Sequence, residues 1–151
     1  MQLFDRIRLK GRSDKPSIVA DSMVSDRWLS TTVTKSGNYT IKPDTRQEDH
    51  SGRIYVSAQS SGEVKFILPT PTPALNGYHY KFVALTNNYL KVGCASAKIV
   101  SHNSTTRNWV GIGTQPGEVI GGEFVAWCNG THWFVTLRGE SKALGYTTSV
   151  G

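Results

Sequence analysis

Histidine, cysteine and glutamate side chains could perform acid–base, nucleophilic or metal chemistry, but in this chain they are scattered. The histidines are His50, His79, His102 and His132. No two of them have the spacing of a zinc motif such as HExxH, which needs both histidines on one face of a helix. Glu63, Glu118 and Glu123 could hydrolyse sugars as a carboxylate pair only if the fold brought two of them together. The sequence therefore predicts a protein that is not an enzyme and that uses no cofactor and no metal ion.

Cys94 and Cys128 are the only cysteines in the sequence, and neither stands in a CxxC or Cys/His spacing. We interpret both as small buried apolar residues. A disulfide between them is the alternative, which a reducing cytoplasm disfavours. The glycine-rich segment 111–117 could be taken for a phosphate-binding loop, but no lysine closes it and no helical pattern follows. It is predicted to be a turn.

The chain has 151 residues and a formal net charge of +6. This length fits one domain with one core, and the charge favours acidic partners such as nucleic acid, a membrane surface or the negative face of another protein. The sequence contains no apolar run of about 18 residues. The first residues also lack the apolar stretch of a secretion signal. We therefore expect a protein that is made in a cytoplasm and has no membrane partner.

Residues 1–27 form a separate region in which basic and apolar residues alternate. We predict an extended arm that binds a partner surface. The residues expected to make this contact are Phe4, Arg6, Ile7, Arg8, Leu9, Lys10 and Arg12. Nucleic-acid binding is disfavoured, because Phe4 is the only aromatic residue in the basic stretch and base stacking would be poorly supplied. A solvated tail is the remaining alternative.

From residue 28 to residue 139 the sequence has the pattern of a sheet, with short runs rich in Val, Ile, Thr and aromatic residues between turn residues. Strands are predicted at residues 30–35, 39–42, 53–57, 63–68, 78–85, 89–94, 98–101, 109–112, 122–128 and 131–137. Because no helical pattern lies between them, we predict an all-β fold, an antiparallel β-sandwich or barrel-like domain. Residues 140–151 are predicted to be a flexible C-terminal tail.

Alternation along two strands predicts which side faces the core. Val64, Phe66 and Leu68 alternate with charged residues at 63 and 65, so they should face inward. Ile54 and Val56 are assigned to the core in the same way.

The segment 124–135 has the strongest local pattern, because Asn129-Gly130 separates two apolar runs. Asn-Gly accepts positive φ at both turn positions, which predicts a hairpin with a two-residue turn. In that register Trp127 would pair with His132, and Val125 with Phe134. One side of the hairpin closes the core. The other side, made of Val125, Trp127, His132 and Phe134, is predicted to be an oligomer interface.

Four motifs follow one another between residues 31 and 137, and each occurs once. They are SGRIYV at 51–56, FILP at 66–69, GYHYKFV at 77–83 and VAWCNGTHWFV at 125–135. This order resembles a β-sandwich module of tailed-phage structural proteins, which include head decoration proteins and the ends of some tail fibres. A short chain with one module and a basic arm is more similar to a decoration protein, because fibres usually add long repeats.

The resemblance implies a structural virion protein that binds the outer surface of an assembled capsid and bridges its subunits. Its partners would be the major capsid protein and further copies of itself in a homotrimer. Its location would be the capsid surface, after synthesis in the host cytoplasm. Two alternatives remain open. One is a receptor- or glycan-binding fibre tip with an exposed platform of Tyr39, Tyr55, Tyr89 and Trp109, and the other is nucleic-acid binding through the basic arm.

Overall fold

The computed structural model describes residues 32–59, 62–86, 89–101, 104–112, 120–138 and 146–150. The chain divides into two units between Thr31 and Thr32, and every described residue belongs to the second unit. The sequence predicts this boundary after residue 27 instead. The predicted arm, with its proposed contacts from Phe4 to Arg12, lies outside the described residues.

The described residues form eleven β-strands and two short 3-10 helices. The strands are β1 (Thr32–Lys35), β2 (Tyr39–Thr40), β3 (Arg53–Ser57), β4 (Glu63–Leu68), β5 (His79–Ala84), β6 (Tyr89–Cys94), β7 (Ile99–Ser101), β8 (Ser104–Ile112), β9 (Glu123–Cys128), β10 (Trp133–Arg138) and β11 (Tyr146–Val150). The helices are η1 (Gln47–Asp49) and η2 (Pro73–Leu75). All ten predicted strands are present, although β8 begins at Ser104 rather than at residue 109. None of the helices in the described part of the chain is long and apolar enough to cross a membrane.

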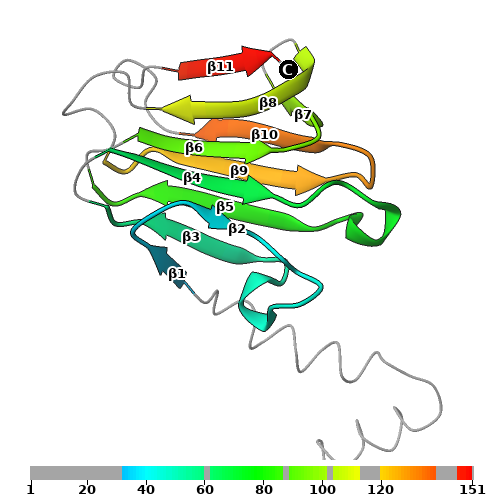
Figure 1. Cartoon of the computed structure of the whole chain (residues 1–151), viewed down its shortest axis with the longest axis horizontal. Helices are drawn as coiled ribbons and strands as arrows, with labels where there is room; N and C mark the ends of the chain where they lie inside the picture. Colours follow the sequence, from blue (N-terminus) through cyan, green and yellow to red (C-terminus); the bar gives the residue numbers. More distant parts are fainter. Residues whose placement is uncertain are drawn as a thin grey trace, which may run out of the picture. The chain divides into compact units, whose positions relative to one another are not determined.

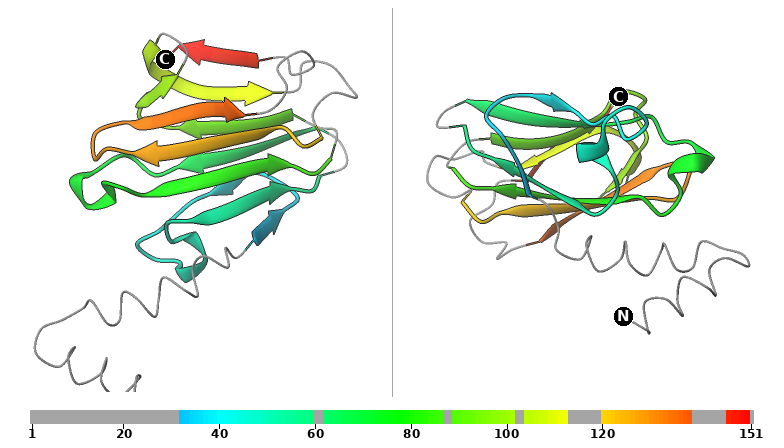
Figure 2. Two further views of the ribbon diagram at one scale, coloured as in Figure 1. Left: turned by 180° about the vertical axis from the view of Figure 1, so that it is seen from behind. Right: turned by 90° about the horizontal axis from the view of Figure 1, so that it is seen from below.

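The strands form one continuous sheet that is folded into two layers and nearly closed into a barrel (Figure 1). One layer has the strand order β1-β3-β5-β9-β10-β7, and the other has β2-β4-β6-β8 with β11 paired to β8. β8 pairs with both β6 and β7, so it joins the two layers. The view from below in Figure 2 shows the layers facing each other. The predicted all-β, barrel-like fold is confirmed.

Strand direction differs from the prediction in the first half of this unit. β1, β3 and β5 are parallel neighbours in one layer, and β2, β4 and β6 are parallel neighbours in the other. The chain therefore alternates between the layers. Each consecutive pair of strands, β1–β2, β3–β4 and β5–β6, makes one turn of the chain through both layers, and we call these three stacked turns coils. A parallel pair needs a long crossover, which a strand of the opposite layer supplies here in place of a helix. The antiparallel prediction is wrong for these coils and for β7 and β10, which are parallel to each other. It is correct for β8, β9 and β11, which are antiparallel to all their partners.

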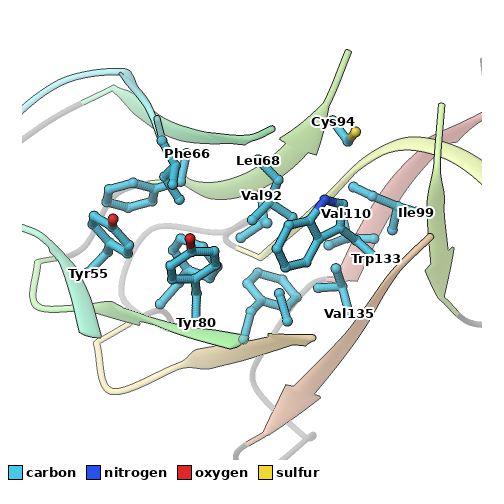
Figure 3. Packing of buried hydrophobic residues seen from close by; sticks show 14 of the residues in the cluster. Tyr55, Phe66, Leu68, Tyr80, Val92, Cys94, Ile99, Val110, Trp133 and Val135 are labelled. Atoms are coloured by element: carbon cyan, nitrogen blue, oxygen red, sulfur yellow. The ribbon is translucent and has the colours of Figure 1, made fainter. Parts of the chain in front are cut away.

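The core lies between the layers (Figure 3), and its largest buried side chains are aromatic rings packed among aliphatic residues. Tyr55 of β3 stacks on Phe82 of β5 with ring centroids 5.5 Å apart. Phe66 of β4 packs against both rings from the opposite layer. Trp133 is fully buried, and its indole N–H donates a hydrogen bond of 2.8 Å to the backbone oxygen of Pro69. Because rings of this size bury large apolar areas, these contacts hold the two layers together.

The predicted inward side is confirmed for β4 and wrong for β3. The inward residues of β4, all buried, are Val64, Phe66 and Leu68. On β3, Ile54 and Val56 are only partly buried, whereas Tyr55 is fully buried. Three successive large residues leave the pattern of this strand ambiguous. The ring of Tyr55 takes the inward position because its hydroxyl finds a buried hydrogen-bond acceptor there.

That acceptor is Asp49, a fully buried carboxylate at the end of η1. Its Oδ1 accepts hydrogen bonds from the hydroxyls of Tyr55, at 2.7 Å, and Tyr39, at 2.9 Å. Its Oδ2 accepts the backbone N–H of Lys42 at 2.7 Å, and the hydroxyl of Tyr80 donates to its backbone oxygen at 2.8 Å. A buried charge is tolerated only when it is well hydrogen-bonded. We name Asp49 and the three tyrosines that donate to it, Tyr39, Tyr55 and Tyr80, the Asp49 cluster. This cluster fixes β2, β3 and β5 around η1.

The β9–β10 hairpin is present, but its turn is longer than predicted. Cys128 pairs with Trp133 and Trp127 pairs with Phe134, which leaves residues 129–132 as the loop. The predicted pairings of Trp127 with His132 and of Val125 with Phe134 are therefore wrong, since Val125 pairs with Thr136. The shift places the two large aromatic residues directly opposite each other, on the same side of the sheet.

The loop is longer because Asn129 uses its side chain to form the turn. Its Oδ1 accepts the backbone N–H groups of Thr131, at 3.0 Å, and His132, at 2.8 Å. In this loop Gly130 has a positive φ, of 88°, and Asn129 does not. The turn is thus an Asx turn, rather than the two-residue turn that needs positive φ at both positions.

Two predictions on the cysteines and the C-terminal end have different outcomes. Cys94 and Cys128 are both free and buried, as predicted, and the alternative disulfide is not formed. Within the predicted C-terminal tail, the described residues 146–150 form β11, which pairs with β8 in antiparallel register. The prediction of a flexible tail is therefore wrong for these residues. This strand lacks an apolar alternation that would have predicted it.

Candidate functional site

Three of the four residues predicted to form an oligomer interface share the outer face of the β9–β10 hairpin. Val125 and Trp127 lie on β9, Phe134 lies on β10, and none of the three is buried. The rings of Trp127 and Phe134 are stacked, with centroids 4.2 Å apart and an interplanar angle of 9°. Trp127 is nevertheless 45% exposed. An exposed large apolar side chain is the informative exception on a protein surface.

His132 is not part of this face. It belongs to the loop before β10, where its Nδ1 lies 3.1 Å from Oγ1 of Thr131. The residue of β5 that pairs with Trp127 is His79. Its Nδ1 lies 3.2 Å from Oγ of Ser51, so this histidine is oriented by its own neighbours at the edge of the face.

The apolar face continues onto neighbouring strands through the sheet register. Phe134 pairs with Val100 of β7, and Val125 pairs with Lys81 of β5. Lys81 Nζ lies 2.5 Å from Oε2 of Glu123, so these two charges offset each other. Sequence reasoning missed Val100, because only the pairing of β7 with β10 brings it beside Phe134. We name Val100, Val125, Trp127 and Phe134 the Trp127 face.

The alternative platform of four exposed aromatic residues is not formed. Tyr55 is fully buried, and Tyr39 is partly buried with its hydroxyl in the Asp49 cluster. Tyr89 and Trp109 do share the outer face of the other layer, on β6 and β8. Lys91 lies between them, with its Nζ 5.9 Å from the ring centroid of Tyr89 and 4.3 Å from that of Trp109.

The scattered histidines and glutamates are not assembled into a reactive centre in the described part of the chain. No group of three His, Cys, Asp or Glu side chains in that part could hold a metal ion. Glu63 and Glu123 form ion pairs on the outer faces of different layers, so they make no carboxylate pair. His102, Glu118 and the glycine-rich residues 113–117 lie outside the described residues.

Comparison of the chain with known proteins found no match among protein-family models, curated proteins or solved structures. The functional proposals therefore rest on the two outer faces and on the order of the sequence motifs.

Proposed function

We propose that this chain is a structural virion protein, without catalytic activity, that binds the outer surface of an assembled phage capsid and bridges its subunits. The observation that carries the proposal is the Trp127 face, where an exposed tryptophan stacks on Phe134 in the middle of a sheet surface. Strands lie on both sides of this pair, β5 beside β9 and β7 beside β10. The aromatic pair is therefore presented by a rigid support.

The chemistry of the Trp127 face fits a second copy of this chain. Tryptophan is enriched among the residues that contribute most to interface affinity, because its large ring loses much exposed area on contact. The whole chain carries a net charge of +6, so two copies repel each other overall. Beside the Trp127 face, however, Lys81 is paired with Glu123. Copies can therefore approach through this face with little local repulsion, and we propose that they form a homotrimer.

The motif order supports a capsid as the larger partner. Residues 1–27 would contact acidic groups of the major capsid protein through their basic side chains, and the interleaved apolar residues would be covered at the same time. Binding only to the assembled shell stabilises that state by mass action. The proposed location is the capsid surface of the virion, after synthesis in the host cytoplasm, with no membrane partner and no nucleic-acid partner.

The test of self-association compares Trp127→Glu with the matched control Thr40→Glu, which adds the same charge at an exposed position of the other layer. We expect the wild type and Thr40→Glu to form the same oligomer in size-exclusion chromatography with light scattering. Trp127→Glu should be monomeric and keep a β-type circular dichroism spectrum. A monomeric wild type would contradict the assembly proposal, and unfolding of Trp127→Glu alone would assign the residue to the core.

The test of capsid binding adds the purified full chain to phage heads that lack a decoration protein. We expect extra density at symmetry-related positions on the shell in cryo-EM, together with heads that withstand a higher temperature before they open. Heads that stay bare at saturating protein would contradict the capsid proposal, whatever the oligomeric state.

A further inference from the structure

The outer face of the layer that contains β4, β6 and β8 has a hollow of about 330 Å³. The residues that line it are Lys65, Ile67, Cys94, Ala95, Asn108 and Trp109. The Trp127 face lies on the other layer, so the hollow is separate from the proposed assembly surface. A cavity of this volume is at the small end of ligand sites, which span about 300–1,000 Å³.

Two glycines of this layer lie beneath the side chains of Lys65, Lys91 and Trp109. Gly93 of β6 pairs with Trp109 of β8, and Gly111 pairs with Lys91, so both glycines lie on the outward side beside the tryptophan. A Cβ on Gly111 would come within 2.9 Å of Lys91 Cγ and 3.2 Å of Trp109 Cζ3. A Cβ on Gly93 would come within 3.0 Å of Lys65 Cε. Neither glycine has a positive φ, so space rather than backbone conformation explains why glycine occupies these positions.

Among the described residues that line the hollow, Trp109 supplies one aromatic ring and Lys65 one positive charge. Lys91 Nζ lies 4.3 Å from the ring centroid of Trp109 and is also ion-paired with Glu63. This contact holds the indole in place and offsets the charge of Lys91. Lys65, by contrast, forms no ion pair with any described residue, and its side chain is only partly buried. An anionic group in the hollow would therefore meet Lys65 as its ion-pair partner.

We propose that this hollow binds an acidic sugar, a single pyranose ring that carries a carboxylate. The C–H groups of the ring pack on the indole of Trp109, and the carboxylate pairs with the ammonium group of Lys65. A ring at the end or branch of a glycan fits a small hollow that is open to solvent. This site does not depend on the assembly function proposed above, because it belongs to the other layer.

Single-stranded nucleic acid fits the same surface less well. Such sites combine a basic groove that follows the phosphates with several aromatic side chains for successive bases. Here Glu63 lies beside Lys91 and would repel a phosphate chain. One carboxylate on one ring matches the ammonium group of Lys65, the one charged residue among the described residues that line the hollow, better than a polyanion does.

The test titrates the full chain with D-glucuronic acid, and with D-glucose as the neutral control, followed by amide chemical shifts. A ligand of this size is expected to bind with a Kd of about 1 mM. The shifts should be confined to residues around Lys65, Asn108 and Trp109, and glucose should bind about fivefold more weakly, because it lacks the charge. No binding of glucuronic acid, or shifts centred elsewhere, would overturn the proposal.

Variants then separate the two contacts. Lys65→Gln should remove the preference for glucuronic acid over glucose, whereas Lys42→Gln, at an exposed lysine outside the hollow, should leave it unchanged. Gly111→Ala should weaken both sugars, because the added methyl group displaces Trp109 and Lys91. Equal affinity of wild type and Lys65→Gln for glucuronic acid would refute the assigned role of Lys65. Tighter binding of an oligothymidine that displaces the sugar would assign the hollow to nucleic acid instead.

Discussion

Raising the pH above about 10 is expected to destabilise this protein, because two buried tyrosines must keep their protons in the folded chain. Burial raises the pKa of Tyr55 well above its usual range, and the hydrogen bond that it donates to the Asp49 carboxylate adds to the shift. Burial also raises the pKa of Tyr80 well above its usual range, and the neighbouring Tyr78 and Asp49 contribute further. Both hydroxyls are hydrogen-bond donors in the core.

The direction of the effect follows from which state holds the proton. Above a pH of about 10 the unfolded chain releases its tyrosine protons, whereas the folded chain keeps those of Tyr55 and Tyr80. The free energy of unfolding therefore has their full contribution below this pH and falls as the pH rises further. Each of the two costs about 1.4 kcal/mol at a pH of about 11, or about 3 kcal/mol together. This is a large share of a typical stability of about 5–15 kcal/mol.

Urea unfolding followed by tryptophan fluorescence, at a pH of about 8 and of about 11, measures the loss. Tyr80→Phe leaves the Asp49 carboxylate with its own donors, and it should reduce the loss of stability between the two pH values by about 1.4 kcal/mol. Tyr89→Phe, at a residue that is 39% exposed, is the matched control and should keep the full effect. If Tyr80→Phe loses stability as steeply as the wild type between the two pH values, the buried hydroxyl of Tyr80 is not a cause and the reasoning is refuted.

Two further predictions concern the loop before β10 and a buried thiol. Gly130→Ala should lower the free energy of unfolding by about 1–2 kcal/mol in urea unfolding, because Gly130 has a φ of 88° and its Cβ would lie 3.4 Å from the Cα of Pro73. Gly37→Ala, with open space around it, is the control, and equal stability of the two variants would contradict the strain argument. A thiol reagent should label Cys128 only after unfolding, since this residue is buried and burial raises the pKa of its thiol. Rapid labelling of Cys128 in the native protein would contradict its placement.

Strand positions could be predicted from the sequence, because each strand carries its own local pattern. β4 even reveals its inward side, since its inward residues are all apolar and Glu63 and Lys65 alternate with them. β3 does not, because Ile54, Tyr55 and Val56 are all large and follow one another. The side that faces inward is decided by Asp49 of η1, whose buried carboxylate accepts a hydrogen bond from Tyr55. No local sequence pattern around Asp49 indicates that this carboxylate is buried.

Strand pairing could not be predicted, because it depends on residues that are far apart in the sequence. Alternation within a strand is the same for parallel and antiparallel neighbours, so nothing local indicates the three coils. The candidate surfaces have the same limit. Trp127 and Phe134 come from one hairpin and were assigned to one face, whereas Val100 and Gly93 acquire their roles only through pairing with β10 and β8.

The two proposed surfaces lie on opposite layers, and the aromatic core separates them. Sheets that pack face to face are about 10 Å apart, and groups at such a distance that share no partner contribute independently. Occupation of the Trp127 face therefore leaves the hollow beside Trp109 open, and a change at Lys65 leaves the stacked Trp127 and Phe134 intact. Binding at one surface could influence the other only if the core had an alternative arrangement of its side chains. The closely packed rings of Tyr55, Phe66 and Phe82 disfavour such an arrangement. A chain held in a shell through one layer could thus still bind a ligand from solution through the other.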